Sequence, residues 1–129
     1  MNCPVCKKGL IVLELDKVEV DLCYSCGGIW LDAGELELLL EGAADKDHFL
    51  SSLRSDEGAG EKRKKCPICA RRMEKISCGI AEEKIRIDKC IKNEGYWFDK
   101  DELQTIIAMA CGEKESRVLT LLKDIFGKQ

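Results

Sequence analysis

The chain has 129 residues, which is enough for one domain or two very small ones. Charged residues make up 35% of it and aromatic residues 5%, and the net charge of −3 argues against a chain that attracts nucleic acid as a whole. No apolar run reaches the roughly 18–20 residues that cross a bilayer. The N-terminal residues lack the basic and apolar stretches of a secretory signal. We therefore expect a cytoplasmic protein without a membrane partner.

Nine cysteines are the most unusual feature of the composition. Because a reducing compartment disfavours disulfides, metal binding is the better use of these thiols. Cys3, Cys6, Cys23 and Cys26 form two Cys-x-x-Cys pairs separated by sixteen residues. Two such tight turns at the end of a hairpin can close a tetrahedron of thiolates, so the spacing predicts a structural Zn²⁺ site. An iron–sulfur cluster is the alternative that four thiolates also allow.

A β-hairpin is predicted between these two cysteine pairs. Residues 10–15 are mostly apolar, and residues 18–22 alternate apolar with acidic side chains, which is the period of a half-buried strand. Asp16 and Lys17 would form the turn. The hairpin would carry a cysteine loop, or knuckle, at each of its open ends.

Helices are predicted after the second knuckle. Asp32 is a good N-cap and Glu35 stands at the reciprocal position of a capping box, as do Asp99 and Glu102 later in the chain. This role accounts for carboxylate pairs that could otherwise be mistaken for catalytic ones. Apolar stripes predict helices near residues 36–40, 49–53, 103–110 and 118–126. The last of these could join two copies of the chain into a homo-oligomer.

The chain then repeats itself. A charged linker is predicted at residues 55–65, after which the Cys-Pro-x-Cys motif recurs and residues 90–103 repeat the pattern of residues 23–36. Four extra residues in the second copy predict a longer, glycine-containing turn between strands at 73–76 and 84–88. We predict a small α+β protein of two tandem zinc-ribbon-like units, residues 1–54 and 66–129. Each unit is a β-hairpin with cysteine knuckles followed by helices.

The second copy has an incomplete set of ligands. Cys66, Cys69 and Cys90 align with the first three cysteines of the first copy, but Asn93 replaces the fourth, and an amide oxygen is a poor zinc ligand beside thiolates. Three interpretations stay open: an empty vestigial site, zinc held by three thiolates with water, Asn93 or Glu94, and a three-thiolate site with an open position for chemistry. The sequence therefore leaves a second Zn²⁺ open.

Other conspicuous side chains have simpler explanations. Cys78 would lie near the hairpin tip, on the order of 20 Å from the knuckles, so we do not expect it to be a ligand. We predict that Cys111 is a packed thiol and that His48 is a surface residue. Trp30 and Trp97 would each pack a helix onto its hairpin.

The first copy resembles the small prokaryotic zinc-ribbon family called TFIIB-type transcription-factor zinc fingers. The matching motif, from Cys3 to Leu36, reads Cys-Pro-x-Cys, then Asp-x-Cys-x-x-Cys-Gly-Gly-x-Trp-Leu-Asp-x-Gly-Glu-Leu. The resemblance implies a zinc-ribbon fold and zinc binding, and it covers most of residues 1–40. Residues 66–103 look like a diverged member that departs from the pattern at Asn93, Glu94 and Asp101.

No catalytic constellation emerges from the sequence. We therefore expect a non-catalytic interaction module that binds a protein partner, with a role in transcription implied by the resemblance. Two alternatives stay open. One is nucleic-acid binding through the basic stretch at residues 62–75. The other is a thiol- or metal-based sensor or enzyme that uses the incomplete second cysteine site.

Overall fold

The computed structural model describes residues 1–56, 62–80, 82–112 and 116–126. Within these ranges the chain forms seven strands and four helices. They are β1 (Ile11–Leu15), β2 (Val18–Leu22), β3 (Ile29–Asp32), α1 (Glu35–Leu39), α2 (Lys46–Ser51), β4 (Arg54–Ser55), β5 (Glu74–Ile80), β6 (Glu83–Lys89), β7 (Gly95–Phe98), α3 (Glu102–Cys111) and α4 (Arg117–Phe126).

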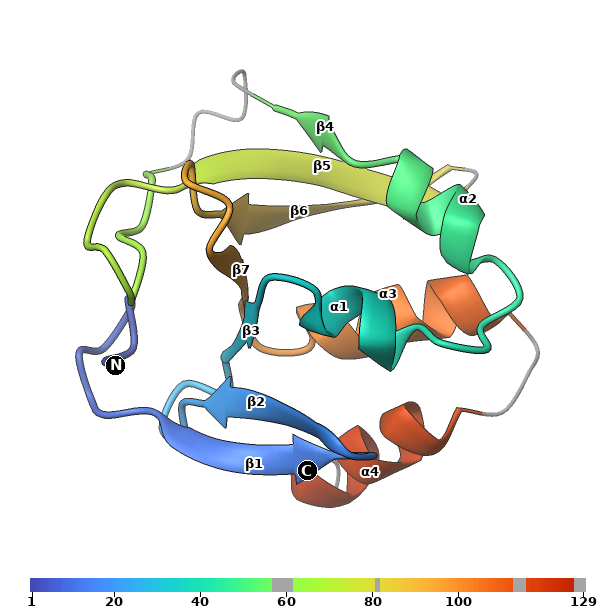
Figure 1. The fold of residues 1–129 in the computed structure, drawn as a ribbon, viewed down its shortest axis with the longest axis horizontal. Coiled ribbons are helices and arrows are strands. Elements are labelled where there is room, and N and C mark those ends of the chain that lie inside the picture. The colour runs from blue at the N-terminus through green and yellow to red at the C-terminus, as the bar shows by residue number, and fades with distance from the viewer. Residues whose placement is uncertain (57–61, 81, 113–115, 127–129) are drawn as a thin grey trace.

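The described strands form one antiparallel sheet in the order β1-β2-β3-β7-β6-β5-β4. Figure 1 shows this sheet curving around α1 and α3, with the β1–β2 hairpin on one side and the β5–β6 hairpin on the other. The loops that precede and follow the hairpins gather at the end of the molecule where the N-terminus lies. The small α+β class predicted from the sequence is confirmed.

The first hairpin has the predicted form. β1 and β2 pair in register from Ile11–Leu22 to Leu15–Val18, so that only Asp16 and Lys17 lie between them. Both turn residues have positive φ, 47° and 73°, as a type I′ turn requires. This turn matches the right-handed twist of the strands and places Leu15 in the core.

The second hairpin differs from the prediction of a longer turn, which was wrong. β5 and β6 pair continuously from Glu74–Lys89 to Ile80–Glu83, so the four extra residues lengthen both strands. Gly79 lies inside this ladder opposite Lys84, and a Cβ there would overlap the backbone of Glu83. Gly79 was predicted to lie in a turn, but it lies where two strands approach each other closely.

Two short central strands were not predicted. β3 and β7 pair with each other in register from Ile29–Phe98 to Asp32–Gly95, and this pairing joins the two hairpins into one sheet. The boundaries at 1–54 and 66–129 stay predictions, as does the tandem repeat. Within the predicted linker, Ser55 lies in β4 and pairs with Ile76, while residues 57–61 lie outside the described residues.

The N-cap prediction was wrong for both aspartates. α1 begins at Glu35, after a left-handed Gly34, and the Asp32 carboxylate accepts a 2.9 Å hydrogen bond from the Trp30 indole. The other half of the capping box is present, because the Asp32 N–H donates to the Glu35 carboxylate at 2.7 Å. The C-terminal segment repeats both bonds, at the same lengths, between Trp97, Asp99 and Glu102.

The main core fills the space between the sheet and the helices. It includes Cys78 and Cys111, which are buried thiols, and burial raises the pKa of Cys78 to about 12. His48 is exposed on α2, as expected for a surface residue. None of the helices in the described residues is both long enough and apolar enough to cross a bilayer.

Candidate metal centres

Four loops at one end of the sheet carry the remaining cysteines. In the three Cys-x-x-Cys loops, the residue after the second cysteine has positive φ and donates its N–H to the carbonyl of the first cysteine. These residues are Lys7, Gly27 and Ala70, with bonds of 2.9, 2.8 and 2.8 Å. The left-handed residue curls the loop so that both sulfur atoms point to the same side.

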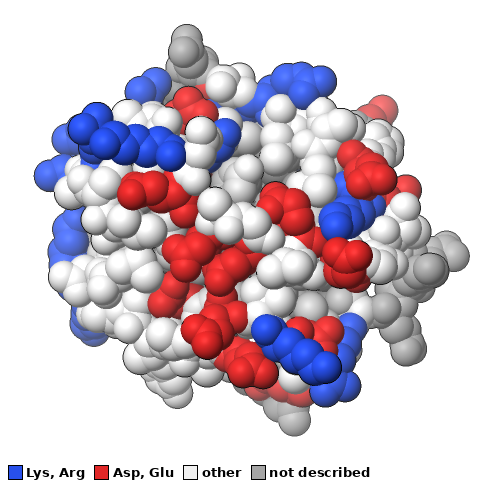
Figure 2. Space-filling model, viewed as in Figure 1, with Lys and Arg blue, Asp and Glu red and all other residues white. Residues whose placement is uncertain are grey.

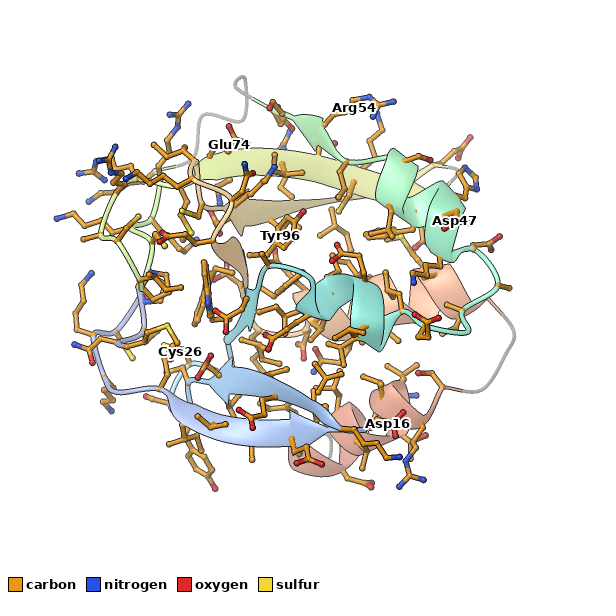
Figure 3. All side chains as sticks on the ribbon, in the orientation of Figure 1. Asp16, Cys26, Asp47, Arg54, Glu74 and Tyr96 are labelled. Atoms are coloured by element: carbon orange, nitrogen blue, oxygen red, sulfur yellow. The ribbon has the colours of Figure 1, made fainter. Side chains whose placement is uncertain are left out.

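Site one is formed by Cys3, Cys6, Cys23 and Cys26, whose sulfur atoms all lie within 4.8 Å of one another. The Cys3–Cys26 and Cys6–Cys23 sulfur pairs are 3.9 and 3.5 Å apart. A tetrahedral ion with Zn–S bonds of 2.3 Å requires a sulfur–sulfur separation of about 3.8 Å. The donor atoms and their spacing therefore fit Zn²⁺, as the sequence predicted. Figure 3 labels Cys26 beside the start of the β1–β2 hairpin.

Backbone groups of the knuckles contribute to the electrostatics of site one. The N–H groups of Val5 and Cys6 point at the Cys3 sulfur, at 3.3 and 3.5 Å. A hydrogen bond from the Lys8 backbone lowers the pKa of Cys6 to about 7, while the contact with Cys6 raises the pKa of Cys26 to about 12. Without metal, part of the site holds protons, which an incoming ion must displace.

Site two is formed by Cys66, Cys69, Cys90 and Glu94, whose ligand atoms also lie within 4.8 Å of one another. The Cys69 and Cys90 sulfur atoms are 3.8 Å apart. The Glu94 Oε1 atom lies 3.6 Å from the Cys66 sulfur and 3.1 Å from the Cys90 sulfur. Three thiolates and a carboxylate are a donor set that zinc accepts. Of the interpretations left open by the sequence, the structure favours the one with Glu94 as the fourth ligand.

Asn93 occupies the position equivalent to Cys26, but its backbone conformation differs from that of Cys26. Asn93 adopts the left-handed conformation with φ of 61°, which asparagine tolerates better than most residues. The three Cys-x-x-Cys loops place this conformation one residue later, just after the ligand. In the fourth loop it falls on the ligand position itself, so Asn93 is exposed and Glu94 supplies the ligand atom. Glu94 therefore has more support than Asn93 as the fourth ligand of site two.

The two sites are joined by a small second core. It contains Trp30, Trp97 and Met73, all fully buried, together with cysteines of both sites. Trp30 and Trp97 are partners in the β3–β7 register. Each indole lies where the other segment has a glycine: a Cβ on Gly28 would overlap Trp97, and one on Gly95 would overlap Trp30. The tryptophans thus connect the two sites, and the prediction that each packs a helix onto its own hairpin was wrong.

A buried ion pair supports site two only. Asp88 is fully buried and pairs with Lys75 at 2.9 Å and with Lys64 at 3.6 Å. The equivalent register position in the first hairpin pairs Asp21 with Val12, which has no charge. Desolvation raises the pKa of Asp21. Part of the basic stretch at residues 62–75 is therefore committed to holding the fold.

Charge is unevenly distributed over the surface. Figure 2 shows acidic side chains across the middle of this face and basic side chains toward its edges. Several of the basic groups lie on the side where Figure 1 places the knuckle loops. The end of the molecule with the metal sites thus differs in charge from the face over the helices.

Comparison with known proteins finds a family similar to the N-terminal segment. Residues 2–42, which include all four cysteines of site one, match the family of transcription factor zinc-fingers of the TFIIB zinc-ribbon type. The N-terminal segment is therefore similar to the zinc ribbons of this family. The matched region ends before site two, so this comparison does not test the internal repeat. No curated protein and no solved structure matches the chain.

Proposed function

We propose that this chain is a non-catalytic interaction module in which two zinc ions hold four knuckle loops in place. The observation that carries the proposal is the same at every loop: the ligand atoms face inward and an apolar side chain faces the solvent. The exposed fractions are 49% for Val5, 84% for Tyr24, 47% for Ile68 and 50% for Ile91. Exposed apolar groups on a rigid frame favour a protein partner.

The ligand set of site two supports a structural role over a catalytic one. A catalytic zinc site keeps one coordination position open for water or substrate. Here Glu94 offers a fourth ligand atom, and the residues Cys66 and Cys90 are buried. The sensor or enzyme alternative therefore has weaker support than the interaction module.

The two segments support an origin by tandem duplication. Each contributes a hairpin, a short strand with a buried tryptophan, and a helix that follows an indole–aspartate bond of 2.9 Å. The role in transcription rests on the family of residues 2–42. A reducing compartment such as the cytoplasm suits nine free thiols.

The metal part of the proposal is tested by native mass spectrometry against a denatured control, with the element identified by plasma emission. Two zinc ions per chain are expected. One zinc would leave site two vestigial. Iron, or no metal after purification from metal-replete medium, would overturn the structural role of zinc.

The partner part is tested by affinity capture from the source cells with a knuckle variant, Val5→Ser/Ile68→Ser/Ile91→Ser. The matched control changes three exposed apolar residues elsewhere, Val12→Ser/Leu38→Ser/Ile125→Ser, which are 62%, 58% and 42% exposed. A partner identified with the wild type should be lost with the knuckle variant and kept with the control. Equal retention by both variants would refute the role of the knuckle tips.

A further inference from the structure

A groove separates the first knuckle loop from the segment that leads to the third. Its volume is about 590 Å³. One wall contains Pro4 and Val5, and the remaining lining is cationic. The cationic residues are Lys7, Lys62, Arg63, Lys64, Lys65 and Arg72. No carboxylate lines the groove among the residues that the structure describes.

Most of these cations are directed to solvent. Lys7, Lys62, Arg63, Lys65 and Arg72 are exposed. Lys64 pairs with two carboxylates, Asp99 at 3.2 Å and the buried Asp88. Lys7 and Arg72 each donate one hydrogen bond to a backbone carbonyl, at 3.2 and 3.0 Å, which leaves their charges unpaired with any carboxylate in the described residues. Like charges gathered in one concave surface repel each other and concentrate the field in the groove. The folded chain therefore gathers positive charge here although its net charge is −3.

We propose that this groove binds a single strand of nucleic acid. This inference goes beyond the proposed interaction module, and it does not depend on a protein partner at the knuckle tips. A strand carries a fixed negative charge on every nucleotide, which complements a groove whose charged lining residues, in the described part of the chain, are all cations. The guanidinium groups of Arg63 and Arg72 match the oxygen geometry of a phosphate.

The apolar wall and the size of the groove favour a strand over other polyanions. Val5 is 49% exposed and can contact the flat face of a base or sugar, which an acidic peptide does not offer. The volume lies in the range of pockets that enclose small molecules. A duplex, which is far wider than a single strand, would contact only the rim of the groove.

The proposal is tested with the zinc-loaded full chain and fluorescein-labelled dT12 and rU12, by anisotropy between 50 and 300 mM NaCl. Each neutralised phosphate contributes about −0.7 to the slope of log Kobs against log salt, so about four contacts give a slope near −3. A duplex of the same length and a glutamate peptide of equal charge serve as competing ligands. Tighter binding of either one than of the single strands would overturn the proposal.

The residues are tested with Lys62→Gln/Arg63→Gln/Lys65→Gln. Binding of dT12 should weaken at least tenfold, and the slope should fall by about 2 because three phosphate contacts are lost. The matched control, Lys17→Gln/Lys84→Gln/Lys123→Gln, removes the same charge from exposed positions on the β1–β2 turn, β6 and α4. It should bind within twofold of the wild type. Equal weakening in both variants, at wild-type zinc content and Tm, would assign the binding to net charge and refute the groove.

Discussion

Site one and site two lie at the same end of one sheet and use the same kind of loop, yet they differ in one ligand. Site one has four sulfur atoms, and site two has three with the carboxylate of Glu94. The difference arises from one residue of backbone, because Asn93 takes the left-handed conformation that Gly27 takes one position later in the equivalent loop. A ligand set can therefore change while the fold around it stays the same.

The segments around the two sites also differ in how they are supported. Behind site two, Asp88 and Lys75 form a buried ion pair, whereas Asp21 faces Val12 in the first hairpin. The N-terminal segment relies on four thiolates, and the C-terminal segment adds longer strands and an ion pair to a weaker donor set. We therefore expect metal loss to cost the N-terminal segment more than the C-terminal one.

The largest expected effect comes from removing one thiolate of each site. Structural zinc contributes on the order of 10 kcal/mol to folding, so each variant should release one zinc ion and lower the Tm. Cys23→Ala should lower the Tm more than Cys90→Ala, because the longer strands and the buried ion pair still support the C-terminal segment. Zinc content and thermal unfolding measure both effects. Cys111→Ala, which removes a buried thiol outside both sites, should keep two zinc ions. An equal loss of Tm from the two site variants would contradict the asymmetry.

The buried ion pair gives the next largest effect. Lys75→Met leaves Asp88 buried with only Lys64, 3.6 Å away, and should cost about 3 kcal/mol in urea unfolding. Val12→Ala, at the equivalent and exposed position, should cost no more than about 0.5 kcal/mol.

A second variant separates the unpaired charge from lost packing. Lys75→Met/Asp88→Leu removes both charges and should recover most of the stability, because apolar pairs often replace buried ion pairs without loss. If the double variant is as unstable as Lys75→Met alone, the buried charge is not the cause.

The interlocked tryptophans predict a third effect. Gly28→Ala and Gly95→Ala would each force a methyl group into an indole of the other segment, at a cost of about 1–3 kcal/mol. Gly95→Ala should be the worse of the two, because its Cβ also meets the backbone of Leu31. Gly9→Ala has open space around its Cβ and serves as the control. Urea unfolding, followed by tryptophan fluorescence, measures the stability of all three variants. If the three are equally stable, the indoles can shift to accommodate the added methyl groups at little cost.

Restoring the missing cysteine sharpens the comparison of the two sites. Asn93→Cys/Glu94→Gly gives the fourth loop the Cys-Gly-Gly sequence of residues 26–28. It should tighten zinc binding at site two by about tenfold, which is about 1.4 kcal/mol. Competition with a chelator measures the affinity, and Co²⁺ absorption reports the extra thiolate. Glu94→Gln, which weakens the carboxylate ligand, should move the affinity in the opposite direction.

The parts of this structure that depend on neighbouring residues could be predicted from the sequence, and the parts that depend on distant pairing could not. The β1–β2 hairpin and the ligands of site one follow from strand alternation and from cysteine spacing. The pairing of β3 with β7 joins residues far apart in the chain, and neither four-residue strand has a sequence pattern that identifies its partner strand. Asp32 was expected to cap a helix because the capping-box pattern is visible in the sequence. The hydrogen bond that Asp32 accepts from the Trp30 indole has no sequence signature.

Glu94 could be found only as one of several alternatives for a related reason. Its role depends on the φ angle of Asn93, and a residue type limits that angle without fixing it. A longer side chain one position beyond the expected ligand is the signal that was available. Aligning the loops by their cysteines therefore places the fourth ligand at Asn93, one residue before Glu94.

The smallest expected effect concerns pH and compares Glu35 with Glu102. Burial, with a contribution from the charge of Asp99, raises the pKa of Glu102 to about 7, above the usual 4.5. The folded state therefore binds more protons than the unfolded state between these values, so this group makes the protein less stable as the pH rises from 4.5 to 7. Glu102→Gln keeps an oxygen that can accept the Asp99 N–H and removes the titration.

The stability of Glu102→Gln relative to wild type should thus increase across this pH window. Because Glu102 is partly exposed, the gain should be modest, on the order of 2 °C in Tm between pH 5 and 8. Taking the difference at each pH cancels the loss of zinc from protonated thiols, which is common to both proteins. Burial also raises the pKa of Glu35, so Glu35→Gln should shift in the same direction. Parallel Tm curves for wild type and Glu102→Gln would mean that the carboxylate ionises in the folded state as it does in water.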